Sequence, residues 1–232
     1  VRAHVPGTPC GLGFLPDGTP IAVSLRERRL LRIQGSTVTP YADLSRISPF
    51  LNDMVIDGQG RAYVGDAGYN VLTEKEVKPG SIILVQPDGR TGVVARGLSA
   101  PNGVLITADG HLIVAESLAN CLSSFPIQPD GTLGEKSNVT ALAGIPDGIC
   151  LDAEGGVWVA LFDKDRFDRV LHGRVVETID TPGRHAIACQ LGGDDGRTLF
   201  LLTYAGDHAD IGKTRTAQVE TVTVEAPAAG SP

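Results

Sequence analysis

The chain has 232 residues, and its 20 Lys and Arg against 27 Asp and Glu give a formal net charge of −7 at pH 7. No basic cluster is longer than Arg26 to Arg29, so the positive face that nucleic-acid binding requires is missing and we expect no nucleic-acid partner. No run of about eighteen apolar residues is present, so we expect no membrane partner either. The sequence has no signal-peptide core, which favours a cytoplasmic location.

Five units of the same kind follow one another along the chain, each beginning with two short strands that a tight turn joins. Every turn contains an acidic or amide residue followed by glycine, which supplies the positive φ that such a turn requires. The turns lie at Pro16 to Gly18, Asp57 to Gly60, Ala108 to Gly110, Ala153 to Gly155 and Asp194 to Gly196. No amphipathic helix of three turns is found between them.

Further strands follow the first two in every unit. The third strands are predicted at Arg29 to Ile33, Ser81 to Gln86, Cys121 to Ile127, Asp168 to His172 and Ala217 to Val224. The fourth strands are predicted at Thr37 to Ala42, Thr91 to Arg96, Val139 to Ala143 and Val175 to Asp180. The last unit lacks a fourth strand, and we expect the lone N-terminal strand Arg2 to Val5 to complete it and protect its edge.

Each unit opens with a short phrase whose second residue precedes the acidic or amide residue of the turn by seven positions. These second residues, 42, 50, 45 and 41 positions apart, are Cys10, Asn52, Asn102, Asp147 and Ala188. Four antiparallel strands repeated at such a spacing are typical of the blades of a β-propeller. We therefore predict an all-β fold, a single β-propeller domain over residues 1–232 with about five blades. A β-sandwich, the alternative, offers no reason for the repeated phrase.

Three of the five equivalent positions carry an amide or carboxylate oxygen. In a propeller these positions face the central channel at one mouth, so Asn52, Asn102 and Asp147 form a partial shell for a hard cation such as Ca²⁺. They carry one negative charge together, so tight binding would require another carboxylate. The alternative is that Asn102-Gly103 and Asp147-Gly148 are turn dipeptides. That alternative would leave only a very short strand before each hairpin turn.

The remaining polar residues give weaker indications. Asp66 and Glu116 end the second strands of their units, where they either turn toward the channel and contact a substrate or form solvated strand ends. The four cysteines show no C-x-x-C spacing, so we expect buried free thiols and no zinc cluster. They are Cys10, Cys121, Cys150 and Cys189.

Three phrases, Leu51 to Asp57, Ala100 to Gly103 and Ile145 to Ala160, resemble the family of regucalcin (senescence marker protein), gluconolactonase and luciferin-regenerating enzyme. The similarity runs from about Gly7 to Val224. Members of that family are six-bladed propellers that bind one divalent cation on the axis and hydrolyse sugar lactones or related esters. The resemblance implies one divalent cation here, with Ca²⁺ favoured over Zn²⁺, Mg²⁺ or Mn²⁺.

Carried over by position, the resemblance implies that Asn102 and Asp147 bind the metal and that Asp147 is also the catalytic base. Asn52 matches a residue that contacts substrate or a water on the metal, and Asp66 and Glu116 remain weak substrate-binding candidates. The family's other metal ligand is a glutamate in the phrase that opens its first blade, and this chain has no such phrase. We expect the chain to lack that blade, through truncation or, less favoured, as a natural five-bladed ring.

These residues predict a metal-dependent hydrolase that opens a small-molecule sugar lactone, with the cation as Lewis acid and Asp147 as ligand and general base. The alternative is a non-catalytic or impaired propeller that binds metal or a partner, because the glutamate ligand is missing. An incomplete ring could also be filled by another chain, which makes an oligomer possible. A condensing enzyme of the strictosidine-synthase type is a third alternative, but no matching glutamate is specific enough to support it.

Overall fold

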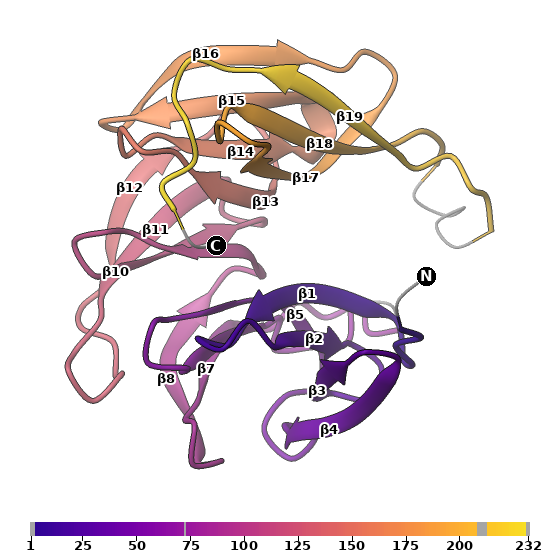
Figure 1. The fold of residues 1–232 in the computed structure, drawn as a ribbon, viewed down its shortest axis with the longest axis vertical. Helices are drawn as coiled ribbons and strands as arrows, with labels where there is room; N and C mark the ends of the chain where they lie inside the picture. The colour runs from indigo at the N-terminus through magenta and orange to yellow at the C-terminus, as the bar shows by residue number, and fades with distance from the viewer. Residues whose placement is uncertain (1–2, 72, 208–212, 231–232) are drawn as a thin grey trace.

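The computed structural model describes residues 3–71, 73–207 and 213–230 (Figure 1). Within them, the first blade contains β1 (Pro9–Phe14), β2 (Pro20–Ser24), β3 (Arg29–Gln34) and β4 (Thr37–Asp43). The second contains β5 (Leu51–Ile56), β6 (Ala62–Asp66), β7 (Gly80–Val85) and β8 (Thr91–Leu98). The third contains β9 (Pro101–Ile106), β10 (His111–Glu116), β11 (Cys121–Pro126) and β12 (Ser137–Ala141).

The fourth blade contains β13 (Pro146–Leu151), β14 (Val157–Leu161), β15 (Arg166–Leu171) and β16 (Arg174–Asp180), with a 3₁₀ turn, η1 (Phe162–Lys164), before β15. The fifth contains β17 (His185–Gly192), β18 (Thr198–Tyr204) and β19 (Gln218–Thr223). Every strand pairs antiparallel with the next one of its sheet. The predicted β-propeller of five blades is thus confirmed, with three strands in the last blade. The described residues contain no helix with the length and apolarity that a membrane span requires.

The blades stand around a central channel, with β1, β5, β9, β13 and β17 innermost (Figure 1). Each of these strands packs on the next one, whereas no packing of that extent joins β1 to β17 in the described part of the chain. The ring is therefore open between the first and the last blade.

One hydrophobic cluster fills each junction between neighbouring blades. In the first junction, Ile21 and Val23 pack with Met54 of the second blade. Three similar clusters join the second blade to the third, the third to the fourth and the fourth to the fifth. Trp158 and Phe167 are fully buried in the last of these. Because burial of apolar surface is the main favourable contribution to folding, each blade is stabilised chiefly by its neighbours.

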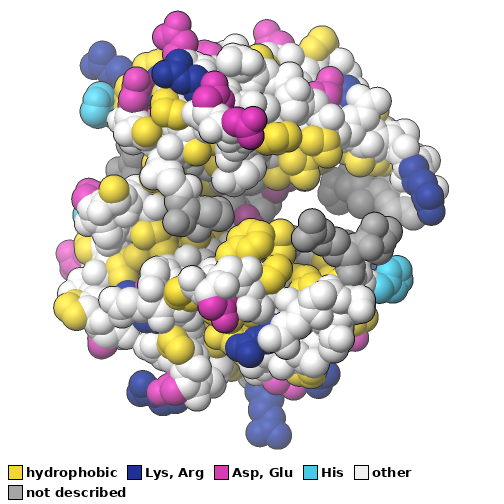
Figure 2. All heavy atoms as spheres, viewed as in Figure 1, with side chains coloured by type: hydrophobic (Ala, Val, Ile, Leu, Met, Phe, Trp, Pro, Cys, Tyr) yellow, Lys and Arg dark blue, Asp and Glu magenta, His cyan; other side chains and the backbone are white. Residues whose placement is uncertain are grey.

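Two apolar side chains of the first blade face the open side of the ring. Leu12 and Phe14 of β1 are 54% and 41% exposed, and hydrophobic atoms border the opening in the space-filling view (Figure 2). On the last blade, Val219 of the edge strand β19 is 66% exposed. Both end blades therefore lack a covering neighbour among the described residues.

The prediction that Arg2 to Val5 closes the ring is wrong for the described part of that segment. Arg2 lies outside the described residues, and the residues after it belong to no strand. The chain that follows is instead tied to the first blade, where Ser24 Oγ donates a hydrogen bond of 2.9 Å to the Pro6 carbonyl. This anchor keeps the N-terminal segment beside its own blade, so in the described part of the chain β19 pairs only with β18.

Candidate functional site

An extra residue interrupts the innermost strand of each of the first four blades. In the fourth, Pro146 pairs with Leu161 and Ile149 with Val159, so two residues of β13 face one residue of β14. The innermost strands of the first three blades show the same shift. The bulged pairs are Cys10-Gly11, Asn52-Asp53, Asn102-Gly103 and Asp147-Gly148. Such β-bulges re-aim side chains and are frequent beside functional sites.

The fifth blade departs from this arrangement. The extra residue of β17 is Ile187, which lies one position before Ala188. The equal spacing of the phrases had suggested that Ala188 is equivalent to Cys10, Asn52, Asn102 and Asp147. The structure shows instead that the bulged residue of the fifth blade is Ile187. Because both residues are apolar, this part of β17 presents no ligand for a cation.

The glycines of the bulges allow neighbouring innermost strands to approach closely. A Cβ atom on Gly103 would lie 2.6 Å from the Asp147 carbonyl oxygen, and one on Gly148 would lie 2.6 Å from the Ala188 Cβ. Neither glycine has a positive φ, and both lie inside strands. The alternative that Asn102-Gly103 and Asp147-Gly148 are turn dipeptides is therefore wrong.

Hydrogen bonds orient the two amide side chains, directly to the next blade for Asn52 and through Ser117 of the same blade for Asn102. Asn52 Nδ2 donates to the Pro101 carbonyl at 3.3 Å. Asn102 Nδ2 donates to Ser117 Oγ at 3.4 Å, and the Ser117 hydroxyl in turn donates to the Pro146 carbonyl at 2.7 Å. Both amides thus act as donors through nitrogen, so their oxygen atoms are the groups suited to a cation or a substrate hydroxyl.

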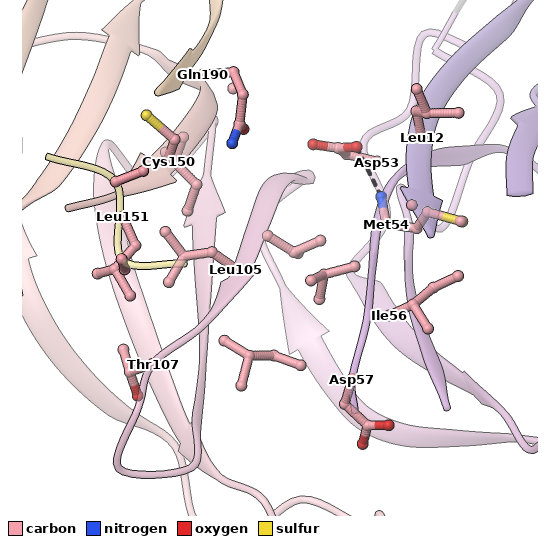
Figure 3. Close-up of a pocket in the computed structure, with 18 of the residues that line it drawn as sticks. Leu12, Asp53, Met54, Ile56, Asp57, Leu105, Thr107, Cys150, Leu151 and Gln190 are labelled. Carbon is pink, nitrogen blue, oxygen red and sulfur yellow. Dashed lines mark hydrogen bonds between the residues drawn. The ribbon is translucent and has the colours of Figure 1, made fainter. Parts of the chain in front are cut away.

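Asp53 is a site residue that the sequence prediction missed. It stands in the second blade where the first, third and fourth blades have glycine, and its carboxylate points into the channel (Figure 3). Asp53 Oδ1 accepts a hydrogen bond of 2.8 Å from the Met54 amide. A Cβ on Gly11 would lie 2.8 Å from the same oxygen, so the missing side chain at Gly11 makes room for the carboxylate.

The two channel carboxylates have strongly altered acidities. Burial raises the pKa of Asp53 to about 6, against hydrogen bonds from the Met54 and Val104 amides that lower it. Burial raises the pKa of Asp147 to about 7; the charge of Asp53 adds to the increase and a hydrogen bond from Asn102 opposes it. No Lys, Arg or His in the described part of the chain forms an ion pair with either group.

A cavity of about 410 Å³ extends from Asp53 along the channel toward the hairpin turns. Its wall comes from the innermost strands of all five blades and is largely apolar, with Asp57 and Thr107 near the far end (Figure 3). The C-terminal segment contributes to its wall through residues 228–230, and the Ala153 amide donates a hydrogen bond of 2.8 Å to the Pro227 carbonyl. A small organic molecule could therefore lie beside Asp53, whereas Asp147, Asn52 and Asn102 are not among the residues that line this cavity.

Asp66 and Glu116 are buried inside their blades, 5% and 1% exposed, so the alternative of solvated strand ends is wrong. Asp66 accepts hydrogen bonds from the hydroxyls of Ser48 and Ser81 at 2.6 and 2.9 Å. Glu116 forms an ion pair of 2.5 Å with Lys136 and also accepts hydrogen bonds from the Ser99 amide and the Ser123 hydroxyl. These partners satisfy both carboxylates, and their contact with substrate stays a prediction.

The donor set at the channel mouth suits a hard divalent cation. Two carboxylates, Asp53 and Asp147, and two amide oxygens, from Asn52 and Asn102, are ligands that Ca²⁺ prefers. No cluster of three or more His, Cys, Asp or Glu with metal-binding spacing occurs in the described residues, so amides or water would have to complete any shell. Asp53 adds a second carboxylate to this candidate donor set.

The comparisons with known proteins agree with the repeat architecture. A family model described as "SMP-30/Gluconolactonase/LRE-like region" matches residues 2–205. The 6-deoxy-6-sulfogluconolactonase of Pseudomonas putida is 28% identical over 156 residues, which cover 65% of this chain and 52% of that protein. The first curated relatives are matched over only 52% to 60% of their own length.

Two solved structures share the fold at low sequence identity. A luciferin-regenerating enzyme superposes with a TM-score of 0.80 at 16% identity, covering 97% of this chain and 81% of that one. A regucalcin from Agrobacterium tumefaciens, described as a calcium-binding protein, superposes with a TM-score of 0.64 at 18% identity, covering 96% of this chain and 92% of that one.

Proposed function

The chain belongs to the SMP-30/gluconolactonase/LRE-like family, and from this premise we propose that it is a metal-dependent hydrolase that opens sugar lactones. A relative named for lactone hydrolysis, the sulfogluconolactonase of Pseudomonas putida, supports the substrate class. The proposal extends to this chain an activity that belongs to longer relatives, so it needs a direct test.

The observation that carries the proposal is the pair of desolvated carboxylates Asp53 and Asp147, of which Asp53 lines the cavity of about 410 Å³ and Asp147 precedes Gly148, which also lines it. Two such groups repel each other when both are ionised, and no basic side chain of the described residues balances them. A bound cation would supply the missing positive charge, and the cavity would hold an organic substrate beside it.

We propose Asn102 and Asp147 as cation ligands, with Asp53 as the second carboxylate and Asn52 nearby. Ca²⁺ is the favoured ion, with Zn²⁺, Mg²⁺ or Mn²⁺ as alternatives, and the calcium-binding regucalcin of Agrobacterium tumefaciens supports that choice. When bound, the ion would supply Lewis-acid polarisation of the lactone carbonyl and a counter-charge for the developing oxyanion.

Asp147 is the residue that we propose for proton transfer. Its carboxylate would accept a proton from the attacking water while the water oxygen bonds to the lactone carbonyl carbon. The bond from that carbon to the ring oxygen then breaks, and the proton passes from Asp147 to the ring oxygen to give the open hydroxy acid. In the metal-free protein the pKa of Asp147 is about 7, and a bound cation would lower it, so Asp147 would be ionised and able to accept the proton near neutral pH.

Asp53 resolves a conflict in the role of Asp147. A carboxylate that binds a cation tightly is a poor base, because the ion draws on the same oxygen electrons. With Asp53 on the second blade and Asp147 on the fourth, the two carboxylates can divide the tasks of holding charge and moving a proton. Asn52, oriented by the Pro101 carbonyl, would then contact the substrate hydroxyls.

The proposal is tested by measuring gluconolactone hydrolysis, corrected for the spontaneous reaction, in the presence of CaCl₂ and after treatment with a chelator. We expect Asp147→Ala to abolish the enzymatic rate and the matched control Asp180→Asn, an exposed carboxylate of β16, to retain it. Full activity of Asp147→Ala, or of protein shown to be free of metal, would overturn the proposal.

Non-catalytic binding of metal or a partner is the second candidate. It is favoured by the open ring and by the share of the relatives' length that the chain leaves unmatched. Calorimetric titration with CaCl₂ separates the candidates, because binding without hydrolysis supports this one. A cytoplasmic location, the absence of nucleic-acid and membrane partners and oligomer formation through the open side remain proposals.

A further inference from the structure

Two buried cysteines from neighbouring blades face each other. Cys150 lies on β13 and Cys189 on β17, and their sulfur atoms are 3.6 Å apart, with the Cys150 thiol donating to Cys189 Sγ. Both are free thiols, 4% and 5% exposed. A disulfide has an S–S length of about 2.05 Å, so the two sulfur atoms need to approach by about 1.6 Å.

The strands that carry the two thiols already lie close together. Gly148 and Ala188 approach so closely that a Cβ on Gly148 would lie 2.6 Å from the Ala188 Cβ. The Cys189 thiol also donates to the Trp158 carbonyl at 3.5 Å, so its sulfur is held at the junction of the fourth and fifth blades. The remaining approach is of the size that rotation of the two side chains provides.

The pair is buried, but both residues lie at the channel cavity. Cys150 and Cys189 are among the residues that line it, and Figure 3 shows the Cys150 sulfur directed away from the middle of the cavity. The other two cysteines differ from them, since Cys10 is exposed and Cys121 is half-buried, and both lie on other blades. The prediction of buried free thiols is thus confirmed for Cys150 and Cys189 but not for the other two cysteines. Both buried cysteines line the same cavity.

We propose that Cys150 and Cys189 are an oxidation site that forms an interblade disulfide when a small peroxide enters the channel. One thiolate attacks a peroxide oxygen, the O–O bond breaks and one water leaves with the thiol's proton, which gives a sulfenic acid. The second thiol attacks that sulfur and expels a second water. Two thiols are oxidised to one disulfide, and hydrogen peroxide is reduced to two waters.

The disulfide would fasten the last blade to the rest of the ring. The fifth blade packs on the fourth blade but lacks a comparable contact with the first, so it depends on this one junction. Cross-linking residues that are 39 positions apart restricts the unfolded chain and raises stability. For a chain of this size we expect the melting temperature to rise by roughly 5–10 °C.

The test uses the 232-residue chain carrying Cys10→Ser and Cys121→Ser, so that only the pair remains. After treatment with hydrogen peroxide and removal of the excess, the protein is denatured, alkylated and weighed by mass spectrometry. We expect the loss of two hydrogen atoms, no alkyl group added, and a higher melting temperature that dithiothreitol reverses. The unsubstituted chain, oxidised and mapped by peptides, should show Cys150 linked to Cys189.

A matched control carries Cys189→Ala in the same background and should neither cross-link nor gain stability on oxidation. The proposal is overturned if both thiols remain open to alkylation after peroxide treatment. It is also overturned if they oxidise separately to sulfinic acids, or if the cross-link joins two chains. This inference concerns the fourth and fifth blades and does not depend on the proposed lactone hydrolysis.

Discussion

The charge of Asp53 on the second blade raises the pKa of Asp147 on the fourth, so the two carboxylates interact electrostatically across the channel. Burial raises the pKa of both, and no ion pair within the described residues neutralises either one. A buried charge without a partner is costly, and the usual relief is a proton or a cation. We therefore propose that Asp53 and Asp147 both hold the cation and move the proton.

Replacing Asp147 by Asn should lower kcat for lactone hydrolysis by about 10²–10⁴-fold, because a neutral amide cannot accept the proton from water. Steady-state kinetics at saturating CaCl₂ measures the effect, and near-ultraviolet circular dichroism checks the fold. Asp180→Asn serves as the control, since that side chain is exposed on an outer strand. Wild-type kcat in Asp147→Asn would show that another group moves the proton.

Replacing Asp53 by Asn should weaken Ca²⁺ binding by at least roughly tenfold, because the site loses one of its two charges. The same change removes the repulsion that raises the pKa of Asp147, so the acidic limb of the pH–rate profile should move to lower pH. Calorimetry and pH-dependent kinetics measure the two effects. An unchanged affinity together with an unchanged profile would remove Asp53 from the site.

Replacing Gly103 by Ala should destabilise the protein by about 1–3 kcal/mol, because the new methyl group would lie 2.6 Å from the Asp147 carbonyl oxygen. The strand carrying Asp147 would have to move, so Ca²⁺ affinity should fall as well. Gly92→Ala is the matched control, since no atom lies within 4 Å of the added methyl group. Equal urea midpoints for the two variants would contradict the close approach of β9 and β13.

Replacing Glu116 by Gln should lower stability by about 1–3 kcal/mol, because two interactions of the buried carboxylate are weakened: the ion pair with the partly exposed Lys136 and the hydrogen bond from the Ser99 amide. Urea denaturation measures this change, and kinetics on the same variant decides the role predicted from the sequence. A raised KM at unchanged kcat would support contact with substrate. An unchanged urea midpoint would show that the interactions of Glu116 with Lys136 and the Ser99 amide do not stabilise the fold.

The metal-free protein should lose stability as pH rises from about 4 to 7. Asp53 and Asp147 have folded-state pKa values of about 6 and 7 against 3.8 for an ordinary aspartate, so the folded state binds more protons in this interval. The stability contributed by the protonated Asp53 and Asp147 is fully present below the pKa of an aspartate in the unfolded chain. It is lost as pH rises through the folded-state pKa values of the two groups. Melting temperatures measured with a chelator should fall across this range, and less so in the variant carrying both Asp53→Asn and Asp147→Asn.

Much of the fold follows from the sequence, because each of the five units carries the same pattern of strands and glycine-containing turns. The hairpin turns lie where the glycines require them, and the predicted third and fourth strands agree with the observed ones to within about two residues. The strand predicted at Arg2 to Val5 could not be judged in this way. Such pairing depends on whether the chain reaches the last blade, and the hydrogen bond from Ser24 to the Pro6 carbonyl ties the residue after this segment to the first blade.

The site was predicted only in part, because a β-bulge leaves no direct signature in a sequence. Residues that follow each other in a strand normally face opposite sides, so Asn52 and Asp53 were not expected to serve one channel. The available signal was the acidic residue at the position where three other blades carry glycine. Likewise, Cys150 and Cys189 are far apart in sequence and come together only because neighbouring blades pack on each other.

The most direct test of the account measures gluconolactone hydrolysis by the chelator-treated protein while CaCl₂ is added back, with binding followed by calorimetry in parallel. We predict that the enzymatic rate is lost without metal and returns in proportion to the occupied sites, and that neither recovery nor binding at wild-type affinity occurs in the variant carrying both Asp53→Asn and Asp147→Asn. Hydrolysis that is equally fast without metal, or recovery in that variant, would contradict the account.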